Sequence, residues 1–225
     1  RKICVAYDGM DVFFPKKKIV FTGNPVRNDI LNTTAKKAIA ITHFGLNPNL
    51  KTILIIGGSL GARTINESIK DKLTQIKACN VQLLWQTGSY YYSAMKSAVD
   101  GEACSNVFPQ EFINKMDFAY AVSDVIISRA GALSVSELCI VGKPAILVPS
   151  PNVSEDHQTK NARALVDKDA AIMISDKDAR AALIPALFDL LKDEAKQFAL
   201  KENIKLMGIS DADIRIVGEI YKLVD

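Results

Sequence analysis

The sequence has few histidines and cysteines, no long apolar run and no large charge excess, and each absence excludes a class of protein. None of its apolar runs approaches the roughly 18–20 residues that span a bilayer, so we expect no transmembrane helix. Its four cysteines form no C-x-x-C pair and it has only two histidines, which argues against a structural zinc site and for free thiols in a reducing compartment. Its net charge of +3 lacks the basic excess of a dedicated nucleic-acid binder.

What remains is the composition of an ordinary folded protein. Hydrophobic residues make up 48% of the 225 residues and charged residues 24%, which excludes wholesale disorder and fits one large or two small domains. The chain begins with Arg1 and enters a strand-like stretch at once, without the pattern of a signal peptide. We therefore expect no signal peptide, and we expect a further part of the protein to precede Arg1.

Short, continuously apolar runs alternate with stretches of helical periodicity over about residues 45–190. The apolar runs cover residues 53–56, 81–85, 106–108, 125–127, 145–148 and 171–174. The helical stretches cover residues 62–76, 90–99, 115–122, 133–141 and 157–168. Continuous apolar character is typical of strands buried on both faces, so the pattern predicts an α/β fold with a Rossmann-like, doubly wound parallel sheet. Helices are expected to follow at 179–206 and 211–223, with Ser210 capping the last one.

The opening of the chain follows a different pattern. Residues 2–7 and 18–22 are expected to form two strands joined by a loop that contains Gly9 and Pro15. Two strands cannot bury their own apolar side chains, so we expect them to belong with the preceding part of the protein. The next expected elements are a turn at residues 23–25 and a helix at residues 34–44 that ends at Gly45.

A glycine-rich turn leads from the first strand of the predicted sheet into a helix. It reads Gly57-Gly58-Ser59-Leu60-Gly61-Ala62-Arg63. Glycines let the backbone approach a ligand closely, and the N–H groups of a helix N-terminus favour an anion such as pyrophosphate. The turn lacks the Gly-Lys-Ser/Thr ending of a P-loop. The next strand ends in Trp85-Gln86-Thr87, without the carboxylate that an NAD-binding fold places there, which disfavours NAD.

Two other interpretations of this turn stay open. Residues 57–61 also match G-x-S-x-G, the nucleophile elbow of serine hydrolases, with Ser59 as nucleophile. His157 would then be the base, and Asp124 or Asp117 would orient it. Alternatively, the glycines serve only the packing of the helix against the strand.

A second glycine turn favours ligand binding over the hydrolase. Residues 128–137 read Ser-Arg-Ala-Gly-Ala-Leu-Ser-Val-Ser-Glu and again lead from a strand into a helix, which a catalytic triad does not explain. A ligand lying across two helix N-termini at one edge of the sheet explains both turns. Glu137 is expected in the first helical turn, where it would hold ribose hydroxyls or stabilise the helix dipole. Asp211 and Asp213 have the D-x-D spacing of metal-chelating glycosyltransferases, but helix capping explains them better.

Six segments occur in the order seen in one family of enzymes. They are residues 23–27, 57–63, 86–88, 111–113, 129–137 and 156–162. Together they resemble the bacterial MurG family, the undecaprenyl-diphospho-muramoylpentapeptide β-N-acetylglucosaminyltransferases, from about residue 2 to beyond residue 175. The resemblance implies the GT-B architecture, in which two Rossmann-like domains enclose the active site between them.

The resemblance also implies that the chain is the C-terminal half of a GT-B glycosyltransferase. Residues 1–27 would be the last strands of an N-terminal acceptor domain together with the linker. Residues 28–209 would be the C-terminal domain that binds UDP-GlcNAc, and residues 210–225 a helix that packs back toward the N-terminal domain.

The family's diphosphate-binding positions match five residues of this sequence. Arg27 and Ser59 would contact the diphosphate side of the donor. The backbone N–H groups of Ala132, Leu133 and Ser134 would bind phosphate. A lone arginine in a loop is usually just solvated, so the role of Arg27 depends on the resemblance.

The nucleoside and sugar positions follow in the same way. The Ile113 backbone would read the edge of uracil, Glu137 would hold the ribose hydroxyls, and Gln158 would bind hydroxyls of GlcNAc. Thr159 follows Gln158 where some relatives carry a second glutamine. Ala130 stands where a serine is common, which should matter little because the neighbouring backbone would do the binding.

The implied reaction is the inverting transfer of GlcNAc from UDP-GlcNAc to the C4 hydroxyl of MurNAc in lipid I, which gives lipid II. Backbone N–H groups and a helix dipole would stabilise the departing UDP, so no metal or other cofactor is expected. The family's general base, lipid I site and membrane-contacting surface belong to the N-terminal domain, so no catalytic residue is assigned. The protein is expected as a peripheral protein on the cytoplasmic side of the bacterial inner membrane. The chain alone is expected to bind the donor weakly or not at all and to turn over nothing.

Two alternatives share the donor site. A non-catalytic module of the cell-wall machinery would bind UDP-GlcNAc without transferring it. A UDP-GlcNAc 2-epimerase would need further acidic and histidine catalytic residues, which a chain with two histidines can hardly supply.

Overall fold

The centre of the molecule is a six-stranded parallel sheet. A computed structural model describes residues 1–6, 10–153 and 156–223. The strands lie in the order β5-β4-β3-β6-β7-β8 and pair in parallel. They are β3 (Lys51–Ile56), β4 (Val81–Gln86), β5 (Val107–Gln110), β6 (Val125–Ser128), β7 (Ala145–Leu147) and β8 (Ile172–Met173). The chain winds outward in both directions from the β3–β6 pair, so the predicted doubly wound α/β sheet is confirmed and its switch point lies between these strands.

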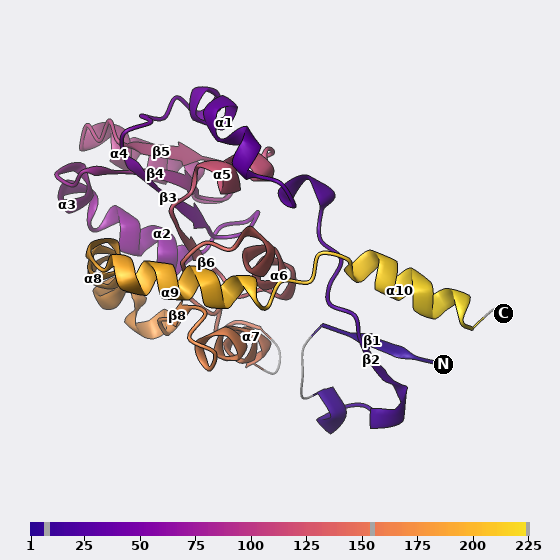
Figure 1. Ribbon diagram of the computed structural model, residues 1–225. Coiled ribbons are helices and arrows are strands. Elements are labelled where there is room, and N and C mark those ends of the chain that lie inside the picture. Colours follow the sequence, from indigo (N-terminus) through magenta and orange to yellow (C-terminus); the bar gives the residue numbers. More distant parts are fainter. Residues whose placement is uncertain (7–9, 154–155, 224–225) are drawn as a thin grey trace.

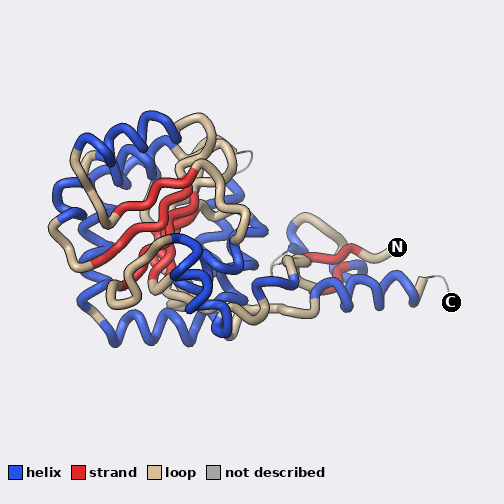
Figure 2. The backbone as a smooth tube through the Cα atoms, turned by 90° about the horizontal axis from the view of Figure 1, so that it is seen from above, coloured by secondary structure: helices blue, strands red, loops and turns tan. Residues whose placement is uncertain are grey.

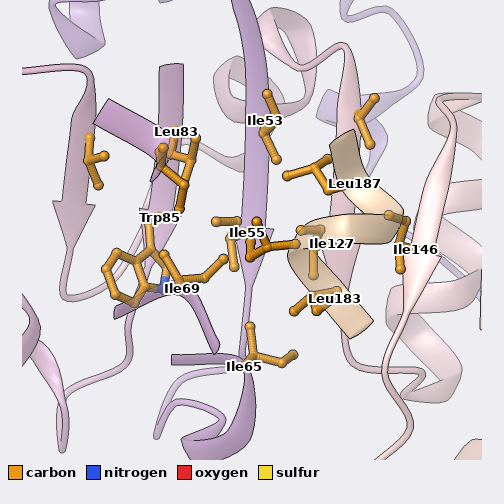
Figure 3. Packing of buried hydrophobic residues seen from close by; sticks show 14 of the residues in the cluster. Ile53, Ile55, Ile65, Ile69, Leu83, Trp85, Ile127, Ile146, Leu183 and Leu187 are labelled. Atoms are coloured by element: carbon orange, nitrogen blue, oxygen red, sulfur yellow. The ribbon is translucent and has the colours of Figure 1, made fainter. Parts of the chain in front are cut away.

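Helices cover both faces of this sheet (Figure 1). One face carries α2 (Arg63–Lys70), α3 (Leu73–Lys77), α4 (Tyr92–Gly101) and α8 (Ala179–Lys192). The other carries α1 (Lys37–Phe44), α5 (Met116–Val122), α6 (Ala132–Val141) and α7 (His157–Val166), and α9 (Glu194–Lys205) packs on α6 and α8. Ile53 and Ile55 of β3 lie in the same core cluster as Leu183 of α8 (Figure 3), whereas Leu54 packs on the opposite face. Because both faces of β3 are covered, its residues 53–56 form a continuously apolar run.

Two of the predicted helices are each divided in two. The stretch at residues 62–76 forms α2 and α3, separated at Lys72, whose φ of −122° is not helical. The stretch at residues 179–206 forms α8 and α9, separated at Asp193. The Asp193 carboxylate accepts a hydrogen bond from the Lys196 N–H (2.8 Å), so it caps a new helix instead of continuing the old one.

The ends of two other helices test the predicted caps. The helix predicted at residues 34–44 begins with a 3-10 turn, η4 (Thr34–Lys36), and α1 then ends at Gly45 with φ +66°, as predicted. The prediction that Ser210 caps the last helix is wrong, because α10 (Ala212–Tyr221) has Asp211 at its N-cap position. The Asp211 carboxylate makes no capping bond either and pairs with Arg215 (2.9 Å), since a charge-assisted contact is available one turn along.

The opening strands form a small sheet of their own. β1 (Ile3–Val5) and β2 (Ile19–Phe21) pair in parallel, and α10 lies beside them, away from the six-stranded sheet (Figures 1 and 2). Within the two strands only Val5 is buried, as expected for a sheet that cannot cover itself. Pro15 of the predicted loop precedes a 3-10 turn, η2 (Lys16–Lys18), whereas Tyr7 and Gly9 lie outside the described residues. Across the described chain, none of the helices has both the length and the apolar character needed to cross a membrane.

Candidate functional site

A polar groove of about 470 Å³ lies at the carboxyl ends of β3 and β6. It is lined by parts of both glycine turns, which we define as the first turn (residues 57–61) and the second turn (residues 128–134). Parallel strands bring their carboxyl ends to one edge, and this edge is the switch point at which ligands of such folds bind. The expectation that the two turns open onto one groove is therefore met.

Two glycines hold the first turn against the turn that follows β4. Gly61 and Gly88 have φ of +90° and +81°, and a Cβ on Gly88 would overlap the backbone of Gly61. The Ser89 N–H also donates to the Ser59 carbonyl oxygen (3.1 Å). The close packing of the two turns thus explains why residue 88 is a glycine. The hydrogen bond fixes the backbone of Ser59, whose side chain is not among those lining the groove.

Both helices that start at the groove begin without a side-chain cap among the described residues. The first intrahelical bond of α2 runs from Asn66 N–H to Ala62, and that of α6 from Val135 N–H to Gly131, each 2.9 Å long. The N–H groups of the residues before these bonds, including Ser134, have no partner within the helix. Such N-termini favour anions, so the groove presents two anion-binding helix ends.

Gln158 connects the second turn to the loop after β7. Its Oε1 accepts hydrogen bonds from the N–H groups of Ala130 (3.2 Å) and Ser150 (2.9 Å). The same side chain lines the groove, and its amide NH₂ makes no hydrogen bond to any described residue. Gln158 is therefore oriented by the backbone and has two donors left for a ligand.

Arg27 and Tyr120 form a second cluster with Glu137 of α6, outside the lining of the groove. Arg27 Nε donates to Glu137 Oε1 (3.0 Å), and the Tyr120 hydroxyl donates to Oε2 (2.8 Å). Burial, reinforced by the Glu137 carboxylate, raises the pKa of the Tyr120 hydroxyl well above its usual value, so it stays a donor. Glu137 is the sixth residue of α6, so its expected place in the first helical turn is wrong and a helix-dipole role is weak there.

The backbone of Ile113 is held by the side chain of Gln86, a residue that the sequence analysis did not assign to the site. The buried Gln86 donates through Nε2 to the Gly58 carbonyl oxygen (3.1 Å) and accepts through Oε1 from the Ile113 N–H (2.9 Å). The Ile113 carbonyl accepts no hydrogen bond from the described residues. One amide thus joins the first turn to the Glu-Phe-Ile segment. The available signal was a glutamine that directly follows the apolar run at residues 83–85 of a buried strand.

We expect Gln86→Leu to lower the free energy of unfolding by about 1–3 kcal/mol, because the buried Ile113 N–H loses its acceptor. Urea denaturation measures this loss, and amide hydrogen exchange should show Ile113 becoming less protected. Gln82→Leu is the matched control, since Gln82 braces the other end of β4 through Asn47 and Thr52. Equal protection of Ile113 in wild type and Gln86→Leu would contradict the proposed brace.

A second network that the sequence analysis missed crosses the groove. Arg129 Nη1 donates to the carbonyl oxygens of Val148 (3.0 Å) and Pro149 (3.1 Å) and to the Asp176 carboxylate. The Thr64 hydroxyl donates to the other oxygen of Asp176 (2.8 Å). The network ties α2 to the ends of β6 and β7. Among the described residues no group of three or more His, Cys, Asp or Glu side chains is placed to hold a metal ion.

The serine hydrolase interpretation finds no support, because each candidate acid is engaged by another partner. Asp124 Oδ2 accepts from the Thr52 N–H (2.7 Å) at the amino end of β3, the opposite edge of the sheet from the first turn. Asp117 pairs with Lys36 (2.8 Å). Burial alone would raise the pKa of the Asp117 carboxyl, but the Lys36 ammonium outweighs burial and holds that pKa below its usual value. Neither carboxylate thus makes a contact, among the described residues, that would orient a base beside Ser59.

Two relatives of high sequence identity carry the same name. A family model described as the glycosyltransferase family 28 C-terminal domain matches residues 52–216. A protein of Parabacteroides distasonis, named UDP-N-acetylglucosamine--N-acetylmuramyl-(pentapeptide) pyrophosphoryl-undecaprenol N-acetylglucosamine transferase, is 53% identical over the whole chain. The protein of the same name from Bacteroides thetaiotaomicron is 49% identical. The chain spans 61% of the length of each of these relatives.

Solved structures share the fold. MurG of Acinetobacter baumannii matches with a TM-score of 0.74 at 27% identity, covering 99% of this chain and 60% of that one. A UDP-GlcNAc 2-epimerase of Neisseria meningitidis, solved with UDP-GlcNAc bound, matches with a TM-score of 0.62 at 20% identity, over 95% of this chain and 57% of that one. The second likeness concerns the fold alone. The predicted fold of the C-terminal half of a GT-B glycosyltransferase is confirmed.

Proposed function

The chain belongs to glycosyltransferase family 28, matching its C-terminal domain, and on that premise we propose that it binds the UDP-GlcNAc donor of a glycosyl transfer. One observation carries the proposal: two glycine turns lead into two helix N-termini that have no side-chain cap among the described residues and that open onto one groove. Oriented N–H groups at helix ends match the charge of a diphosphate. They would also stabilise UDP as it leaves, the electrostatic role that a metal ion plays elsewhere.

In the proposed complex the diphosphate lies between the two turns. Ser59 and the backbone N–H groups of Ala132, Leu133 and Ser134 contact its oxygens. Arg27 adds a positive charge there, for which it has to turn away from Glu137. These contacts involve the groups that a diphosphate needs most, N–H donors and one guanidinium.

The nucleoside and the sugar take the remaining positions. Since the Ile113 N–H is bound to Gln86, its carbonyl oxygen is the group available to the N3–H of uracil. Glu137 accepts from the ribose hydroxyls, and the amide NH₂ of Gln158, which donates to no described residue, binds hydroxyls of GlcNAc.

For the whole protein we propose the inverting transfer of GlcNAc from UDP-GlcNAc to lipid I, giving lipid II. The names of the relatives support this assignment, and the part of their length that this chain does not cover would supply the acceptor site and the general base. Residues 1–27 and 210–225 would pack with that part, which would hold the protein to the cytoplasmic face of the inner membrane.

Titration of the ¹⁵N-labelled chain with UDP-GlcNAc tests the donor assignment, because NMR detects weak binding. We expect saturable shifts of the amide signals of residues 57–61 and 131–134, smaller shifts with CDP, and no GlcNAc transfer by the chain alone. Shifts confined to other parts of the chain, or equal responses to UDP and CDP, would overturn the assignment.

A further inference from the structure

Tyr120 is a core side chain whose one polar atom points at Glu137, the residue proposed to bind the ribose. Its side chain lies on α5 among the largest fully buried residues, with 1% of its surface exposed. Its hydroxyl lies 2.8 Å from Glu137 Oε2. The contact joins α5 to α6, so one end of the Glu137 carboxylate is fixed from inside the protein.

The other carboxylate oxygen has a different kind of partner. Glu137 Oε1 is bound by Arg27 Nε at 3.0 Å, and the Arg27 side chain is 46% exposed whereas that of Glu137 is 13% exposed. An exposed arginine can leave at little cost, because water replaces its contacts. A buried hydroxyl is not replaced in this way. The two carboxylate oxygens therefore differ. Oε2 stays bound to the Tyr120 hydroxyl, whereas the Arg27 contact of Oε1 can be replaced by another donor.

We propose that Tyr120 is a positioning residue for ribose recognition: its hydroxyl fixes the Glu137 carboxylate so that Oε1 is presented to the ribose hydroxyls of a uridine nucleotide. This inference rests on the proposed function, in which Glu137 holds the ribose. Arg27 exchanges places with those hydroxyls and turns to the diphosphate. Without the Tyr120 hydroxyl the Glu137 carboxylate is free to rotate. Binding the ribose then has to order this side chain, and the entropic cost lowers the affinity.

Tyr120→Phe removes only the hydroxyl oxygen and keeps the ring that packs in the core. We expect its affinity for UDP to fall about five- to tenfold and its affinity for 2′,3′-dideoxyuridine diphosphate to fall less than twofold. NMR titration of both ligands gives the two ratios. The loss depends on the ribose hydroxyls, which a general loosening of the fold would not produce.

Ser123→Ala is the matched control. The Ser123 hydroxyl also makes a buried hydrogen bond on this segment, to the Tyr120 carbonyl oxygen (2.9 Å), but it does not contact Glu137. We expect Ser123→Ala to keep the wild-type preference for UDP over the dideoxy analogue. If Tyr120→Phe also keeps that preference, the inference is overturned while the proposed function stands. If wild type itself binds UDP and the analogue equally, the proposed ribose contact fails and the inference fails with it.

Discussion

Gly88→Ala is expected to lower the free energy of unfolding by roughly 3–5 kcal/mol, whereas Gly58→Ala should cost only about 1–2 kcal/mol. Both residues have a positive φ, +81° and +87°, so both substitutions strain the backbone. A methyl group on Gly88 would also overlap the backbone of Gly61, whereas nothing lies within 4 Å of the corresponding position on Gly58. The overlap can be relieved only by separating the first turn from the turn after β4.

Urea denaturation followed by the fluorescence of Trp85, the one tryptophan and fully buried, measures both free energies. Gly58→Ala is the control because it introduces the same methyl group with the same sign of φ. Similar losses in the two variants would show that backbone strain, and not the contact between the turns, is what requires glycine at position 88.

The second large effect concerns binding: Glu137→Ala is expected to weaken UDP binding at least about 30-fold, which is roughly 2 kcal/mol. The change removes the proposed acceptor of the ribose hydroxyls and leaves the buried Tyr120 hydroxyl without its partner. It also releases Arg27, which favours phosphate binding, so the measured loss is a lower bound for the ribose contact.

NMR or calorimetric titration with UDP measures this loss. Glu202→Ala removes the same charge from an exposed position on α9, where Glu202 pairs with Lys205, and should leave the affinity unchanged. Equal binding by wild type and Glu137→Ala would remove the ribose assignment from the proposed function.

The four inner strands could be predicted because they are covered on both faces and therefore carry a mostly continuous apolar signal. Residues 53–56 show this most clearly, with side chains alternating between two buried layers. The breaks at Lys72 and Asp193 could not be predicted in the same way. Helical periodicity continues across both positions. Each helix is interrupted by a local feature, a non-helical φ at Lys72 and a capping carboxylate at Asp193.

The glycine turns could be located from the sequence because each is a short contiguous motif between a strand and a helix. The contacts that orient the proposed site could not. Arg27 and Glu137 are 110 positions apart, and Gln86 and Ile113 are 27 apart, so no local pattern records that they meet. Tyr120 was expected only as part of the helical stretch at residues 115–122, and its hydroxyl gains a role from the position of α6.

The charged side chains that line the groove within the described part of the chain are already neutralised. Arg129 pairs with Asp176, both in the lining, and Arg63 pairs with Glu67 (2.8 Å). The groove therefore attracts an anion through the dipoles of its two helix ends more than through net charge, and this attraction acts over a short range. Dissolved salt screens net charges over about 8–10 Å and has little effect on contacts made at hydrogen-bond distance. We therefore expect the groove to discriminate between anions by close contacts with the shape and spacing of their oxygens, and not by long-range electrostatic steering.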